Sequence, residues 1–161
     1  MRILLTNDDG IDARGICILE EVLSESHEVC VVAPCANRSG SSSSISMYSD
    51  QKLVKKSEKK FSLDGSPVDC VISALRGGYI PFVPEVVISG INNGANLGTD
   101  IIYSGTCGAA RQASLYGVPG LALSIDFSYG ECSFTGSLTE ESEKKDSAYR
   151  SLSYYVRDNM R

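Results

Sequence analysis

Short runs of hydrophobic residues alternate along the chain with stretches in which hydrophobic residues recur at helical spacing. The runs predict buried strands, the third of them weakly, at Arg2–Thr6, Glu28–Ala33, Phe61–Leu63, Pro84–Ser89 and Leu121–Ile125. The spaced stretches and their start signals predict helices at Ala13–Ser26, Ser66–Arg76, Ser104–Tyr116 and Glu140–Met160. The start of the second helix is marked by Pro67 at the first helical position and by Asp69, which completes a capping-box-like pair with Ser66. Because a strand, a helix and a second strand follow one another within about thirty residues, we expect a parallel sheet.

The segments between these elements have the composition of turns and exposed chain. Asn37–Ser44 and Gly90–Gly98 are rich in Ser, Gly or Asn and predict loops, whereas the basic segment Ile45–Lys60 is expected to be extended and exposed, as in a hairpin. No internal repeat or domain boundary interrupts the pattern. We therefore predict a single doubly wound α/β domain over residues 1–161, with a mostly parallel sheet and helices on both faces.

The composition limits what the protein can bind and where it works. The chain has 161 residues, of which 42% are apolar, and a net charge of −5, which argues against a protein that holds long nucleic acid. No apolar run reaches the ~18 residues of a membrane span, and the first residues lack a signal-peptide pattern, so we expect a cytoplasmic location. There the six cysteines are expected to be free, buried thiols, and none is spaced for a zinc site.

The residues that follow the predicted strands are rich in oxygen ligands and backbone donors. In an open parallel sheet such segments meet at one edge, where ligands bind. The segments are Asn7–Gly10, Arg38–Gly40, Gly90–Gly98 and the helix start Ser104–Thr106. We expect a candidate site where they converge.

Asp8 and Asp9 are adjacent carboxylates, which repel each other unless a cation lies between them. Their hard oxygens suit Mg²⁺ or Mn²⁺, and the hydroxyl of Ser39 and the amide oxygen of Asn92 would complete an uncrowded shell. The alternative is an ordinary turn in which Asp9 caps the next helix. The other converging loops favour the metal site.

Ser104, Gly105 and Thr106 open a predicted helix whose free N–H groups and partial positive charge suit a phosphate. The alternative is that Ser104 only caps the helix, which is the commoner role of a serine at such a position. The small residues favour an anion, because they let a ligand approach the backbone.

Five motifs in this order resemble the SurE (survival protein E) family of metal-dependent 5′/3′-nucleotidases. They lie within residues 1–125, at Asn7–Gly10, Arg38–Gly40, Gly65–Cys70, Ser89–Gly98 and Tyr103–Thr106. The resemblance implies a Rossmann-like domain that hydrolyses nucleoside 5′-monophosphates, in some cases also 3′-monophosphates or short polyphosphate, with one divalent ion. It maps the metal ligands to Asp8, Asp9, Ser39 and Asn92, and the phosphate contacts to Asn96, Ser104, Gly105 and Thr106.

The hypothesis for the mechanism is direct hydrolysis by water that the divalent ion activates, with no phosphoenzyme. Asp8 or Asp9 would be the catalytic carboxylate that orients this water or takes its proton. A hydroxyl nucleophile needs an adjacent base, and the single histidine, His27, lies away from the strand-end loops.

Two features depart from the family. Cys35 stands where the family usually has an acidic residue. Family members are also substantially longer, with a C-terminal hairpin and arm that exchange between subunits, so a full-length chain would be expected to form a dimer or tetramer. The last predicted helix is charged, with a thin apolar stripe formed by Ala148, Leu152, Tyr155 and Val156. We therefore expect the 161-residue chain alone to associate weakly or to be poorly active.

The main alternative is a receiver-type signalling domain, which also binds Mg²⁺ through an acidic pair after its first strand. Asp64 could be its phosphoacceptor, but Ser124–Asp126, after the fifth strand, lacks the required lysine. An aspartyl-nucleophile phosphatase needs aspartates at i and i+2, and a dinucleotide-binding protein needs Gly-x-Gly-x-x-Gly. Neither pattern follows the first strand, so the nucleotidase is favoured.

Overall fold

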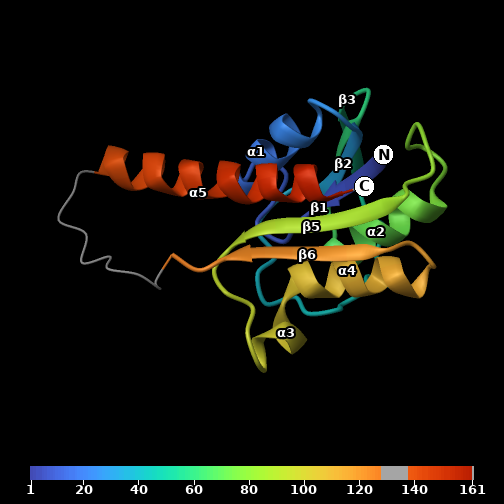
Figure 1. The fold of residues 1–161 in the computed structure, drawn as a ribbon. Helices are drawn as coiled ribbons and strands as arrows, with labels where there is room; N and C mark the ends of the chain where they lie inside the picture. The colour runs from blue at the N-terminus through green and yellow to red at the C-terminus, as the bar shows by residue number, and fades with distance from the viewer. Residues whose placement is uncertain (128–137, 161) are drawn as a thin grey trace.

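Six strands form one sheet in the order β3-β4-β2-β1-β5-β6 (Figure 1). The structure is a computed structural model that describes residues 1–127 and 138–160. The strands are β1 (Arg2–Thr6), β2 (Glu28–Pro34), β3 (Leu53–Ser57), β4 (Lys60–Leu63), β5 (Val86–Asn93) and β6 (Gly120–Ile125). All neighbouring pairs are parallel except β3 and β4, which form an antiparallel hairpin. The mostly parallel α/β sheet predicted from the sequence is confirmed.

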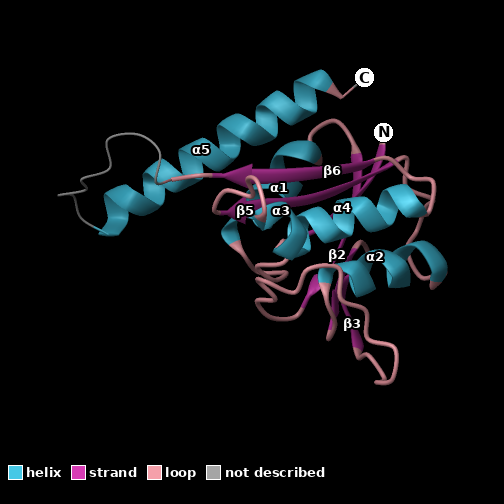
Figure 2. Cartoon of the chain, turned by 90° about the horizontal axis from the view of Figure 1, so that it is seen from below, coloured by secondary structure: helices cyan, strands magenta, loops and turns pink. Residues whose placement is uncertain are grey.

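Helices cover both faces of the sheet (Figure 2). They are α1 (Arg14–Leu23), α2 (Pro67–Arg76), α3 (Asp100–Tyr103), α4 (Gly105–Leu115) and α5 (Leu138–Asn159). One hydrophobic core joins the sheet to α1 and α5 through residues such as Leu19 and Tyr149. The other joins it to α2 and α4 through residues such as Val71 and Ala109. The sheet therefore lies between two helical layers, which is the doubly wound arrangement.

The start of α2 follows the local sequence signal. Ser66 Oγ accepts a hydrogen bond from the N–H of Asp69 at 3.1 Å, and the Asp69 carboxylate accepts one from the N–H of Ser66 at 2.9 Å. Pro67 occupies the first helical turn, where its missing N–H costs no hydrogen bond. The capping box predicted from the sequence is confirmed.

Strand β5 is longer than the sequence predicted. The prediction ended it at Ser89 and placed a loop from Gly90, but the strand continues to Asn93. The register between β5 and β6 is irregular after Ser89. Beyond this irregularity, Asn92 pairs with Ser124 and Asn93 pairs with Ile125. Pairing with a neighbouring strand overrides the turn preference of Gly and Asn, because strand formation depends strongly on context.

The apolar stripe predicted for α5 is only partly right. Val156 is buried and Leu152 half-buried, but Tyr155 is 67% exposed. Tyr149, which the prediction omitted, is buried instead. Tyr149, Ser153 and Val156 are spaced as i, i+4 and i+7, so they form the helix face that packs on the domain.

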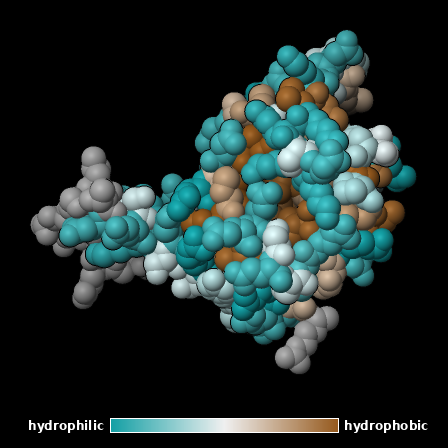
Figure 3. Space-filling view, turned by 90° about the horizontal axis from the view of Figure 1, so that it is seen from above, coloured by the Kyte–Doolittle hydropathy of each residue, from teal (hydrophilic) through white to brown (hydrophobic). Residues whose placement is uncertain are grey.

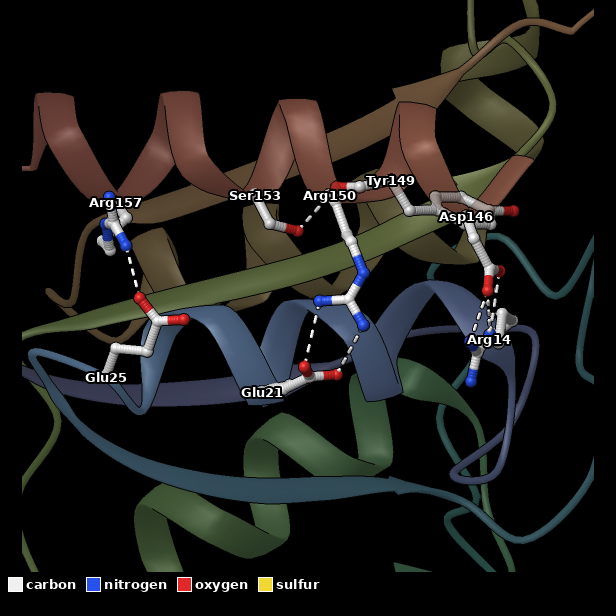
Figure 4. Close-up of polar contacts among 8 residues, drawn as sticks. All are labelled: Arg14, Glu21, Glu25, Asp146, Tyr149, Arg150, Ser153 and Arg157. Atoms are coloured by element: carbon white, nitrogen blue, oxygen red, sulfur yellow. Dashed lines mark hydrogen bonds and ion pairs between the residues drawn. The ribbon is translucent and has the colours of Figure 1, made fainter. Parts of the chain in front are cut away.

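Charged side chains join α5 to α1 and the turn after it (Figure 4). The ion pairs are Arg14–Asp146, Glu21–Arg150 and Glu25–Arg157. The guanidinium of Arg150 makes two hydrogen bonds to the carboxylate of Glu21, at 2.9 and 3.0 Å. Figure 3, seen from above, shows a predominantly hydrophilic surface. Helix α5 is thus held by a narrow apolar face and by ion pairs beside it.

The cysteines only partly match the expectation of buried thiols. Those within the described ranges are free, but Cys35 is exposed and only Cys30 and Cys70 are buried. Burial raises the pKa of the Cys30 thiol to about 12. Cys132 lies outside the described residues.

Candidate active site

A polar pocket of about 300 Å³ lies at the carboxyl ends of β1 and β5. These strands are neighbours, and the chain leaves β1 toward β2 on the opposite side, so the sheet has its topological switch point here. Five of the eight site residues predicted from the sequence line the pocket: Asp8, Ser39, Asn92, Asn96 and Ser104. The predicted convergence of the strand-end loops is therefore present.

The turn after β1 holds the two adjacent carboxylates in place. The Asn7 side chain closes this turn, since its Nδ2 donates to the carbonyl of Gly10 at 2.8 Å and its Oδ1 accepts from the N–H of Gly10 at 3.2 Å. Gly10 has a φ of +105°, a conformation that favours glycine. The N–H of Arg38 donates to the carbonyl of Asp8 at 2.6 Å, which brings the loop bearing Ser39 alongside.

Asp8 contacts the N-terminus of α4 and is 3% exposed. Its Oδ1 accepts a hydrogen bond from the Thr106 hydroxyl at 2.6 Å, and its Oδ2 accepts one from the Thr106 N–H at 3.3 Å. A carboxylate at this position also benefits from the positive end of the helix dipole. The sequence analysis assigned Thr106 to phosphate binding. In this structure both its hydroxyl and its N–H donate to Asp8 instead.

Gly105 allows this close approach between β1 and α4. A Cβ atom at this position would lie 2.8 Å from Ser41 Oγ, 2.9 Å from Asp8 Cβ and 3.0 Å from Pro67 Cγ. Since these atoms belong to three different segments, a larger residue would force the helix away from Asp8. The absence of a side chain at Gly105 therefore helps to position the Asp8 carboxylate.

The remaining groups near the start of α4 could contact an anion. Ser104 caps the helix, with its Oγ accepting from the N–H of Cys107 at 3.1 Å. Within the described part of the chain, the N–H of Gly105 has no hydrogen-bond partner. Across the pocket, Asn96 Nδ2 donates to Ser124 Oγ at 2.7 Å, and its amide carries a second hydrogen.

Asp9 lies beside the pocket rather than in its lining. Its Oδ2 accepts a hydrogen bond from the N–H of Asn93 at 3.3 Å. Burial raises the pKa of Asp9, the hydrogen bond from Asn93 opposes this rise, and the negative charge of Asp8 adds to it. Asp9 is therefore a more basic carboxylate than an exposed aspartate.

The donor set fits a hard divalent cation. In the described residues no group of three or more His, Cys, Asp and Glu side chains is placed to hold a metal, so the ligands would have to include neutral oxygens. Ser39 supplies a hydroxyl, and Asn92 supplies an amide oxygen, because its Nδ2 is already used as a donor to the carbonyl of Gly94 at 2.9 Å. Two carboxylates and two neutral oxygens are ligands that Mg²⁺ and Mn²⁺ accept.

The pocket also contains residues that the sequence reasoning did not assign. Asn93, Asp100 and Tyr103 line it. Asn93 lies within the predicted site segment Gly90–Gly98, and Tyr103 lies within the motif Tyr103–Thr106, but neither residue was assigned a role.

Asp64 does not take part in the pocket. Its carboxylate pairs with the guanidinium of Arg38 at 2.7 Å, and the Cys35 thiol lies 3.8 Å from the same oxygen. The receiver alternative required Asp64 beside the acidic pair. The structure therefore gives that alternative no phosphoacceptor at this position.

Comparisons with known proteins show which chains this one is similar to. The chain is 45% identical over 127 residues to "5′-nucleotidase SurE 1" of Burkholderia lata, an alignment that covers 78% of this chain and 49% of that protein. It is 49% identical over 126 residues to "5′-nucleotidase SurE" of Stenotrophomonas maltophilia, covering 78% of this chain and 48% of that protein. The chain thus spans about half the length of the curated relatives it matches.

The fold comparison extends the similarity to almost the whole chain. The crystal structure of the SurE protein from Aquifex aeolicus superposes with a TM-score of 0.78 at 33% identity, covering 99% of this chain and 61% of that one. The family model described as "Survival protein SurE" matches residues 3–157. This chain is therefore a member of the SurE family.

Proposed function

We propose that this chain is a metal-dependent phosphomonoesterase that hydrolyses nucleoside 5′-monophosphates, with 3′-monophosphates and short polyphosphate as further substrates. The observation that carries the proposal is the single pocket that joins Asp8 to Ser39, Asn92 and Asn96 beside the N-terminus of α4. The pocket has oxygen ligands for a cation and donors for a phosphate. The name "5′-nucleotidase" of relatives that share 45–49% of the aligned residues supports the same reaction.

The two aspartates would have different roles in hydrolysis. A divalent ion, Mg²⁺ or Mn²⁺, held by Asp8, Asp9, Ser39 and Asn92 would supply positive charge that polarises the phosphoryl group and acidifies water. Asp9, which is held beside the pocket by the N–H of Asn93, would take the proton of the attacking water. Asp8, whose carboxylate is fixed by Thr106, orients the reacting groups.

Donors on the other side of the pocket would hold the phosphoryl group. The N–H of Gly105 and the hydroxyl of Ser104, at the start of α4, and the amide of Asn96, in the lining of the same pocket, would contact the phosphoryl oxygens. Donors fixed before the reaction stabilise the charge that develops on the phosphoryl oxygens. We propose direct attack by water, with no covalent step on the protein.

Chelation is the most direct test of the proposal. Release of phosphate from AMP should stop in excess EDTA and return with Mg²⁺ or Mn²⁺. In the same assay Asp9→Asn should lower kcat by at least ~100-fold, because the amide keeps the shape of the side chain but cannot take a proton. Asp158→Asn, an equivalent change at an exposed position on α5, is the control. Full activity in excess chelator would contradict the metal requirement, and an unchanged kcat in Asp9→Asn would contradict its role as base.

A further inference from the structure

An apolar rim borders the polar pocket on the side of α3. Four large apolar side chains within residues 97–103 are exposed: Leu97 by 67%, Ile101 by 42%, Ile102 by 60% and Tyr103 by 64%. Adjacent residues of the same segment, Asn96 and Asp100, line the pocket itself. Exposed apolar side chains in a segment that also lines a polar pocket mark a candidate ligand-binding edge.

Tyr103 belongs to both the rim and the pocket. It is the one aromatic residue among the described residues that line the pocket, where it lies with Asp8 and Ser104. Its backbone is held by the neighbouring serine loop, since the N–H of Ser42 donates to the carbonyl of Tyr103 at 2.9 Å and the Ser42 hydroxyl donates to that of Ile102 at 2.7 Å. The ring therefore projects from an anchored backbone beside the candidate phosphate contacts.

We propose that Tyr103 is a stacking platform for the nucleobase of the substrate. This inference rests on the proposed function. A nucleotide combines an anionic group, which suits the polar pocket, with a planar and largely apolar base, which suits the rim. An aromatic ring stacks on any base, because every base has a π-face, so the site would accept different bases. The aliphatic side chains of Leu97 and Ile102 would flank the stacked base.

A protein partner is the competing occupant of the rim. A stable protein interface buries more than about 1,000 Å² in total, whereas this rim consists of four side chains from one short segment. The rim is also continuous with the pocket through Tyr103, which a separate docking surface would not require. These two observations favour the nucleobase.

The test compares two substrates that share the same phosphate and sugar. The ratio of kcat/KM for AMP to kcat/KM for ribose 5-phosphate measures what the base contributes. Tyr103→Leu should lower this ratio by about 5- to 150-fold, the range expected for one stacked base. Tyr103→Phe should keep the ratio, because it keeps the ring. Tyr48→Leu, at a 97% exposed tyrosine outside the pocket, is the control and should keep it as well.

The outcomes separate this inference from the proposed function. An unchanged ratio in Tyr103→Leu, with both esters hydrolysed, overturns stacking and leaves the nucleotidase intact. If the wild type hydrolyses neither ester, the proposed function fails, and adenosine binding followed by NMR line broadening then decides the stacking. Binding that is lost in Tyr103→Leu and kept in Tyr103→Phe supports stacking, whereas equal or undetectable binding overturns it. A third outcome would assign the rim to a protein partner. In that case the wild type sediments as an oligomer, Tyr103→Leu dissociates it, and the ratio of kcat/KM for AMP to that for ribose 5-phosphate is unchanged.

Discussion

The paired hydrogen bonds from Thr106 to Asp8 join the first strand to the fourth helix, and their removal has a calculable effect. Thr106→Val keeps the volume of the side chain but replaces the hydroxyl 2.6 Å from Asp8 Oδ1 with a methyl group. Thr106 is fully buried and Asp8 is 3% exposed, so water cannot easily replace the lost donor. A hydrogen bond to a charged group contributes about 1.5–3 kcal/mol, and Val should therefore lower the free energy of unfolding by that amount.

Urea denaturation followed by circular dichroism measures this loss directly. For a chain of this size, a loss of about 2 kcal/mol corresponds to a fall in Tm of roughly 4–8 °C. Thr106→Ser is the matched control, because it keeps the hydroxyl and removes only the methyl group, and it should lie much closer to wild type. The Val variant should also bind Mn²⁺ more weakly in calorimetry, since the Asp8 carboxylate loses an orienting contact.

One result would refute the reasoning. If Thr106→Val and Thr106→Ser are equally stable, the hydroxyl does not stabilise the Asp8 carboxylate. The contact would then be a consequence of close packing at Gly105 rather than a cause of the position of Asp8.

Three further predictions follow from other parts of the molecule. Ser66→Ala should lower the free energy of unfolding by about 1 kcal/mol in urea, because it removes the acceptor of the α2 capping box, whereas Ser66→Asn should restore most of it. Docking of α5 should weaken in high salt and in acid, because hydrogen bonds from Arg14 and Arg150 lower the pKa values of Asp146 and Glu21. This stabilisation is complete above the ordinary carboxylate pKa and is lost as the pH falls through the lowered values; equal hydrogen-exchange protection of α5 at pH 7 and pH 3 would contradict it. A single turnover in ¹⁸O-water should place the label in released phosphate, and label in an aspartate of the pocket would instead indicate a phosphoenzyme.

Sequence reasoning succeeded where the determining interactions are local. The capping box of α2 lies within four consecutive residues, Ser66–Asp69, so the sequence alone was enough to place it. The buried strands β1 and β2 are unbroken apolar runs, and the structure has them close to the predicted bounds. The rule that ligands bind at strand ends then brought Ser39 and Asn92 to one edge without any knowledge of distances.

Sequence reasoning failed where the structure depends on contacts between residues that are far apart in the chain. Thr106 and Asp8 are 98 positions apart, so the use of the Thr106 donors by a carboxylate could not be predicted locally. The same holds for the extension of β5, which needs β6 beside it. In α5, both Tyr149 and Tyr155 are compatible with an apolar stripe, and only the contact with the rest of the domain decides that Tyr149 is the buried one.

The ion pairs between α1 and α5 join residues that are synthesised at different times. Arg14 and Asp146 are 132 positions apart, and Glu21 and Arg150 are 129 apart. During synthesis the chain leaves the ribosome from its N-terminus, so Arg14 and Glu21 of α1 have no α5 partner until 132 and 129 further residues have been added. The described residues that line the pocket all lie before residue 105, so they are synthesised before α5. A nascent chain in which α5 has not yet emerged thus already contains the candidate metal ligands Asp8, Ser39 and Asn92.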